Sequence, residues 1–164
     1  MGGRGLTDGA AAQAIAERVV EGMQAGRLYL IGPGTTTRAI KDRLGLGGTL
    51  LGVDAYCDGR TVARDATEAE LLALLPPGQQ ATIVVTVIGG QGYIFGRGNQ
   101  QLGPAVIRRV GVENVVVVAT QGKLTALPVG RLRVDTGDVE LDALLRGYRR
   151  VVTGYAEEAV LPVE

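Results

Sequence analysis

The sequence predicts an α/β fold in which β-α units alternate and build a mostly parallel sheet with helices on both faces. Two segments, 81–88 (ATIVVTVI) and 114–119 (NVVVVA), are nearly continuous runs of β-branched residues, as expected for strands covered on both faces. Segments with helical spacing lie between these and other strand-like segments, which favours βαβ units. The 164 residues contain no internal repeat or low-complexity linker, so we treat 1–164 as one α/β domain.

The first half of the chain opens on a helical pattern, in which Ile15, Val19 and Met23 recur every four residues. We expect Asp8 to be the N-cap of this helix and Gly26 to end it. The further elements expected here are a strand over 27–31, a helix ending at Gly45 and a strand over 49–53 that leads into Asp54.

The second half begins with Thr67 and Glu70, which are spaced as a capping box before the apolar stretch 71–75. Pro104 suits the first position of a helix that follows a glycine-rich stretch. The expected elements are then strands over 81–88, 114–119, 131–134 and 150–153, a loop around Lys123, a helix opened by 135–138 and an acidic tail.

Composition and charge narrow the function classes. Seventeen basic and seventeen acidic residues give a net charge of zero, which argues against nucleic acid or an anionic membrane as partner. The absence of histidine removes Ser-His-Asp and Cys-His catalysis and the commonest zinc ligand. A single cysteine, no apolar run of membrane-spanning length and no signal-peptide pattern favour a cytoplasmic location.

The first candidate site is the segment GPGTTTR, between an expected strand and an expected helix. Glycine lets the backbone approach a ligand, and a helix N-terminus offers free N–H groups to a phosphate. Threonine hydroxyls add donors, and Arg38 or Lys41 adds charge. A tight βα turn with a threonine cap is the alternative. The candidate phosphate-binding residues are Gly32, Gly34, Thr35, Thr36, Thr37 and Arg38.

The second candidate site follows the strongest expected strand, where six glycines fall within 89–103. So many glycines are entropically costly unless the backbone needs unusual dihedrals or close ligand contact. An arginine here can bind a phosphate through two hydrogen bonds. A structural Ω-loop is the alternative. The candidate residues are Gly89, Gly90, Gln91, Gly92, Arg97, Gly98, Asn99 and Gln100.

Acidic residues supply the candidates for catalysis and metal binding. Asp135 and Asp138 are three residues apart at an expected helix start, where they would bind Mg²⁺ or act as a base. An N-cap followed by a first-turn acid is the alternative. Asp54, at an expected strand end, is a candidate metal ligand. Lys123, after VVVVATQG, is a candidate phosphate contact or a solvated lysine.

Several segments together resemble the C-terminal part of ATP-NAD kinase family proteins, in the branch found beside acetoin-catabolism genes. They are LYLIGPGTTTRAI, TLLGVD, VIGGQGYIFGRGNQQLGP, VVVVATQGKL, VDTGD and GYRRVVTGY, and the resemblance covers about residues 10 to 163. It implies an enzyme that phosphorylates NAD to NADP with ATP or polyphosphate and Mg²⁺. Nucleotides or other phosphate-bearing small molecules are then the expected partners.

The resemblance covers only part of a full-length kinase. Full-length members carry an N-terminal α/β domain with a GGDGT motif, whose aspartate is tied to phosphoryl transfer, and this sequence has no GGDGT. We therefore expect either a homo-oligomer or a separate N-terminal kinase domain as partner, and activity of the chain alone stays open. GPGTTT, TLLGVD and VVVVATQGKL also resemble the layout of ribose-5-phosphate isomerase, so a non-catalytic sugar-phosphate or nucleotide-binding module is the alternative.

Overall fold

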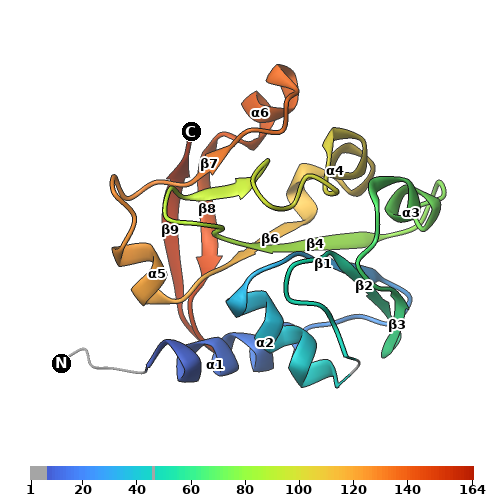
Figure 1. Ribbon diagram of the computed structural model, residues 1–164, viewed down its shortest axis with the longest axis horizontal. Coiled ribbons are helices and arrows are strands. Elements are labelled where there is room, and N and C mark those ends of the chain that lie inside the picture. Colours follow the sequence, from blue (N-terminus) through green and yellow to red (C-terminus); the bar gives the residue numbers. More distant parts are fainter. Residues whose placement is uncertain (1–6, 46) are drawn as a thin grey trace.

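A computed structural model describes residues 7–45 and 47–164 of the protein. Its main feature is a seven-stranded sheet with the order β3-β2-β1-β4-β6-β8-β9. The four central strands β1, β4, β6 and β8 are parallel, whereas β2, β3 and β9 pair antiparallel to their neighbours. This mixed but mostly parallel sheet, with helices packed against it, confirms the predicted α/β class (Figure 1).

The expected strands and helices follow each other in the predicted order, and β3, β5, α5 and β9 are additional elements. The strands of the sheet are β1 (Leu28–Ile31), β2 (Asp54–Cys57), β3 (Arg60–Ala63), β4 (Ala81–Thr86), β6 (Val115–Val118), β8 (Gly147–Val152) and β9 (Glu158–Val163). A separate pair is formed by β5 (Tyr93–Phe95) and β7 (Arg133–Val134). The helices are α1 (Asp8–Glu21), α2 (Thr35–Leu44), α3 (Glu68–Ala73), α4 (Pro104–Val110), α5 (Gln121–Thr125) and α6 (Val139–Leu145), with a 3₁₀ turn, η1 (Val112–Asn114).

Two hydrophobic clusters lie on opposite faces of the sheet. On one face, Ile15 of α1 and Ile40 of α2 pack against the buried Val84 and Val118 of the central strands. The other face carries the larger cluster, to which α3, α4, α5, α6 and the β5–β7 pair contribute. Figure 1 shows α1 and α2 below the sheet and α3, α4 and α6 above it. Helices on both faces leave the loops at the strand ends free for a ligand.

Local sequence signals explain several helix ends. Thr67 and Glu70 form the expected capping box at α3. Pro104 occupies the start of α4, and Asp138 accepts a hydrogen bond from the backbone of Leu141 as the N-cap of α6. Gly45 ends α2 in a left-handed conformation (φ +70°), which glycine adopts without strain. Among the described residues no helix is long and apolar enough to cross a membrane.

Predictions for four parts of the chain are wrong. The N-cap of α1 is Thr7, whose hydroxyl accepts from the backbone of Ala10, and the helix ends before Gly22 rather than at Gly26. The expected loop around Lys123 is α5, because Thr120 caps a short helical turn. The acidic tail contains β9, whose alternating Leu161 and Val163 are buried against β8.

The fourth wrong prediction concerns the second strand, which covers 54–57 instead of 49–53. The carbonyl oxygens of Thr49 and Gly52 accept hydrogen bonds from the buried Lys41 ammonium, so this segment is held outside the sheet. The strand then turns at Asp58 and Gly59, both with positive φ, into β3. Asp-Gly between two strands is a strong hairpin signal, and the sequence reading did not use it.

Candidate functional site

Four parallel strands end at the same edge of the sheet, and the loops after β1 and β6 form a cleft there. The N-terminal turns of α2 and α5 follow these strands, and α1 begins beside them. An added Cβ at Gly122 in α5 would overlap the Asp8 carboxylate of α1, so the two helix starts are in contact. The cleft has a volume of about 270 Å³ and is lined by Asp8, Gly9, Ala12, Gln13, Thr35, Thr36, Arg38, Ala39, Asp42, Thr120 and Lys123.

Gly34 gives the cleft its open helix N-terminus. Its φ of +127° is a conformation that side chains rarely adopt, and an added Cβ would lie 2.5 Å from Cγ2 of Thr86. Gly34 has no side chain to cap α2, unlike Thr7, Thr67 and Thr120 at their helices. The first N–H groups of a helix have no partner within the helix. The first turn of α2 therefore presents donors and a partial positive charge to the cleft.

The threonines of the GPGTTTR segment have separate roles. Thr35 is exposed and lines the cleft, and Thr36 lines it while almost fully buried. Thr37 is completely buried, and its hydroxyl donates to the carbonyl oxygen of Gly34 at 3.2 Å. Thr35 and Thr36 of the predicted set thus line the cleft, whereas Thr37 stabilises the turn at Gly34 through its hydrogen bond.

The charges around the cleft are balanced. Arg38 pairs with Asp42 one turn later in α2, at 2.9 Å, and both lie on the surface. Lys123 is exposed and has no acidic partner within 4 Å among the described residues. Among the described residues, the Lys123 ammonium group is therefore the positive charge of the cleft that has no acidic partner. It lies in the first turn of α5. A phosphate in the cleft would meet Lys123 and the start of α2 together.

Lys41 does not face the cleft, although the sequence offered it as a source of charge there. It is completely buried, and its ammonium group lies 2.9 Å from the equally buried carboxylate of Asp54. Burial disfavours the charged form and lowers the pKa of Lys41 below its ordinary value, against the opposing effect of Asp54. The pair anchors α2 to the start of β2.

Asp54 was predicted as a metal ligand, and its position favours a different role. Its carboxylate accepts hydrogen bonds from the backbone N–H of Thr49 (2.7 Å) and Asp65 (2.8 Å) and from the Thr49 hydroxyl. Burial opposes ionisation, but the hydrogen bonds from Lys41 and the two N–H groups hold the pKa of Asp54 below its usual value. The carboxylate is thus an ionised, fully bonded partner of Lys41.

The second glycine-rich segment is divided between two places. Residues 89–92 form a turn beyond β4, in which Gly89, Gly90 and Gln91 are exposed and Gly92 is buried, and a hydrogen bond from the Ile88 N–H to the Tyr93 carbonyl oxygen closes the turn at 2.9 Å. Ile88 and Tyr93 form an antiparallel bridge, so β5 leads the chain back from the ligand edge (Figure 1). The turn 89–92 therefore lies at that edge of the sheet but does not line the cleft. The residues after β5 lie away from the edge.

The residues after β5 form contacts within the protein. The Arg97 guanidinium pairs with Asp135 at 2.6 Å and stacks on the Tyr93 ring, 4.2 Å from its centre. Asn99 is completely buried and closes the loop, accepting from the Gly96 N–H and donating to the Ile94 carbonyl oxygen. Gln100 is exposed, and Gly98 packs against Ile88. These contacts match the structural alternative of an ordered Ω-loop.

Asp135 and Asp138, the predicted catalytic pair, are both ion-paired. Asp138 accepts from the Leu141 N–H as N-cap and lies 3.0 Å from Arg108, and both contacts lower its pKa. The side chains of Asp135 and Asp138 stand apart from the α1–α2–α5 cleft. No group of three His, Cys, Asp or Glu side chains gathers as a metal cage among the described residues. Mg²⁺ that is bound together with a nucleotide needs only one or two protein carboxylates, and here Asp54, Asp135 and Asp138 are each paired with a basic side chain.

The comparisons with known proteins decide the family. A family model described as the ATP-NAD kinase C-terminal domain matches residues 25–163. The chain belongs to this family. The match confirms the resemblance seen in the sequence, limited as predicted to the C-terminal domain. Comparison with curated proteins and with solved structures found no match.

The residues that match the family model include only part of the cleft. The α2 start at Gly34 and the α5 start at Thr120 lie within the residues that match the ATP-NAD kinase C-terminal domain. Helix α1 precedes residue 25, so Asp8 and the rest of its wall are outside the match. Sequence reasoning found the α2 side and Lys123 but missed the contributions of Thr120 and α1. A signal for Thr120 was present, because it closely follows a buried strand.

Proposed function

We propose that this ATP-NAD kinase family domain binds the phosphate groups of a nucleotide in the cleft between α1, α2 and α5. The observation that carries the proposal is the uncapped α2 N-terminus at Gly34, which opens onto that cleft. Its free N–H groups, the Thr35 hydroxyl and the Lys123 ammonium, which has no acidic partner in the described part of the chain, supply the donors and charge that a phosphate requires. The family match directs the proposal toward ATP, polyphosphate, NAD or NADP as ligands.

The chain's part in phosphorylating NAD is positioning and charge neutralisation. Phosphoryl transfer depends mainly on holding the reacting groups in line and on stabilising the charge of the transferred group. The cleft residues supply hydrogen bonds for that purpose, whereas Asp135 and Asp138 are engaged by arginines. We therefore propose that the catalytic carboxylate comes from an N-terminal kinase domain of the GGDGT-bearing kind, acting together with this C-terminal domain. The exposed residues Gly89, Gly90 and Gln91 at the same edge are our proposed second contact with the ligand.

Binding is the first test, because it does not require catalytic activity. Isothermal titration of the purified chain would compare ATP, NAD, NADP, polyphosphate and ribose 5-phosphate. We expect Lys123→Gln to weaken nucleotide binding about tenfold, the value of one exposed charge-assisted hydrogen bond. Arg60→Gln is the matched control, since it removes a positive charge from β3, far from the cleft in the sheet order.

The outcomes separate the alternatives. Nucleotide binding that weakens in Lys123→Gln and in Thr35→Val, but not in Arg60→Gln, supports the proposed cleft. Binding of ribose 5-phosphate alone would replace the proposal with a sugar-phosphate module. If every ligand binds both cleft variants as tightly as the unchanged protein, the cleft is not the phosphate site. A separate assay of NADP formation, with and without an added GGDGT-bearing domain, tests the need for that domain.

A further inference from the structure

A second concave site lies away from the nucleotide cleft, between α1 and the sheet. This groove has a volume of about 520 Å³, within the range of roughly 300–1,000 Å³ that small-molecule sites occupy. Its lining runs from the first residues of β1, β4 and β6 to Val152 at the end of β8, whereas the proposed nucleotide cleft is lined by the starts of α1, α2 and α5. Its lining is Arg18, Val19, Gly22, Gln24, Arg27, Tyr29, Thr82, Val84, Val115, Val116, Arg150, Val152 and Glu158.

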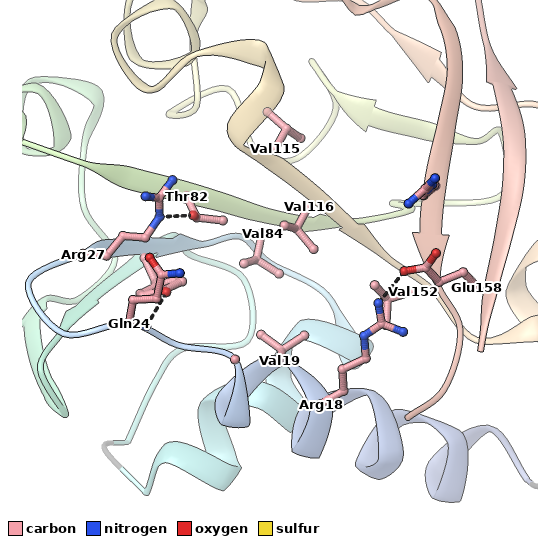
Figure 2. Close-up of a pocket in the computed structure, with 13 residues that line it drawn as sticks. Arg18, Val19, Gln24, Arg27, Thr82, Val84, Val115, Val116, Val152 and Glu158 are labelled. Atoms are coloured by element: carbon pink, nitrogen blue, oxygen red, sulfur yellow. Dashed lines mark hydrogen bonds and ion pairs between the residues drawn. The ribbon is translucent and has the colours of Figure 1, made fainter. Parts of the chain in front are cut away.

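The floor of the groove is apolar because the central strands are apolar on both faces. Val84 of β4, Val116 of β6 and Val152 of β8 share one face, and Val19 of α1 faces them across the groove (Figure 2). Parallel strands of this kind are normally covered on both sides. Here α1 stands off from the strands, and Val116 stays only partly buried. Val84 and Val152 are already buried by the chain itself, so the apolar surface that an occupant would cover is mainly that of Val19 and Val116.

The two ends of the groove are polar. At one end, Arg27 is held in place by three hydrogen bonds, to Thr82 Oγ1 (2.7 Å) and to Ala81 O and Asn114 Oδ1 (both 3.0 Å). At the other end, Arg18 pairs with Glu158. Figure 2 shows Arg27 and Gln24 at one side of the valines and Arg18 and Glu158 at the other.

The lining carries an excess of positive charge. Three arginines stand against a single carboxylate, Glu158, and this carboxylate is already paired with Arg18. Arg150 is exposed and has no ion-pair partner in the described part of the chain. Nη1 of Arg27 likewise has no hydrogen-bond partner among the described residues. An anionic group at the groove would meet donors that nothing in this part of the protein occupies.

We propose that the groove is a binding site for a small apolar anion, a molecule with an aliphatic or aromatic body and one carboxylate or phosphate group. The body lies on Val19 and Val116, and Arg150 binds the anionic group. The polar side chains at both ends limit the length of an occupant, which favours a small molecule over a helix of a partner protein. The site is independent of the proposed nucleotide function and shares no lining residue with the nucleotide cleft.

Titration calorimetry with four ten-carbon probes tests both parts of the recognition. Decanoate and decyl phosphate share the apolar chain and carry the two candidate anionic groups, decanol is neutral and decyltrimethylammonium is cationic. We expect the two anions to bind and the other two probes to bind at least about tenfold more weakly, as one charge-assisted hydrogen bond requires. The ratio of decanoate to decyl phosphate affinity identifies the preferred anionic group.

Three variants locate the binding. Arg150→Gln removes the unpaired guanidinium from an exposed position, so we expect anion affinity to fall while decanol affinity stays the same. Val116→Phe fills the groove and is expected to reduce binding of all probes, with folding checked by its melting temperature. Arg60→Gln is the charge-matched control on β3 and should bind like the unchanged chain. If decanol binds as tightly as decanoate, if no probe binds, or if Arg150→Gln binds the anions unchanged, the proposal is wrong.

Discussion

Replacing Lys41 by Met tests how the fold holds its buried charges. Both Lys41 and Asp54 are 0% exposed, with 2.9 Å between ammonium and carboxylate. The substitution keeps a side chain of similar length but leaves the Asp54 carboxylate buried without its counter-charge. The carbonyl oxygens of Thr49 and Gly52 lose their donor at the same time.

The magnitude follows from what remains after the substitution. Removing one member of a buried ion pair typically costs about 3–5 kcal/mol. Asp54 keeps the N–H groups of Thr49 and Asp65, which places the expected loss near the lower end, about 3–4 kcal/mol. For a chain of this length, that loss corresponds to a fall in melting temperature of roughly 6–16 °C.

Urea unfolding, followed by circular dichroism, measures the change in unfolding free energy. Lys41→Met combined with Asp54→Asn should recover part of the loss, because the asparagine is neutral and its oxygen still accepts one N–H. Arg38→Met is the control, because the Arg38–Asp42 pair is exposed and contributes under about 1 kcal/mol. A Lys41→Met variant as stable as Arg38→Met would refute the idea that this pair holds α2 to β2.

Four further predictions concern stability and pH. Gly34→Ala should destabilise by about 1–3 kcal/mol through the clash with Thr86 Cγ2 and the strained φ, and Thr86→Ser should relieve part of this in urea unfolding. Asn99→Ala leaves buried backbone groups unpaired and should cost about 2–3 kcal/mol, so a change under 1 kcal/mol in chemical denaturation contradicts the loop role. Thr67→Ala removes a capping box and should lower the melting temperature by an amount worth about 1 kcal/mol. Folding lowers the pKa of Asp54, so its contribution to the unfolding free energy is complete above the unfolded pKa of roughly 3.9 and is lost as the pH falls below that value. In unfolding measurements from pH 6 to pH 3, the variant Lys41→Met/Asp54→Asn should therefore lose less stability than the unchanged protein.

Much of the fold was predictable because local signals agreed with the tertiary structure. The run of β-branched residues at 81–86 is fully buried, as a central parallel strand requires. The capping box at Thr67 and the stop at Gly45 are complete within a few residues of sequence. The strand at 158–163 was not predicted, because its charged first residue and exposed Val160 gain order only through pairing with β8.

The candidate site was predictable only where local sequence signals define it, and not where it depends on pairing between distant segments. Glycines and threonines at the end of β1 indicate a ligand loop from sequence alone, and the structure places Thr35 and Thr36 on the cleft. The segment 89–101 could not be divided from sequence, because the turn of direction at β5 depends on its pairing with β7, some 40 residues later. That pairing removes Arg97 from the ligand edge and brings it to Asp135.

The buried pair and the phosphate loop are connected through the segment 47–53. Lys41 holds the carbonyl oxygens of Thr49 and Gly52, and between them the Leu50 carbonyl oxygen accepts the Gly34 N–H at 3.1 Å. Gly34, at the uncapped start of α2, is therefore held by the segment 47–53, and the buried Lys41 in turn holds that segment. A buried ion pair contributes little net stability compared with apolar residues of similar size. Its value in this chain is more readily explained as positioning, because it orients the helix start on which the proposed phosphate site depends.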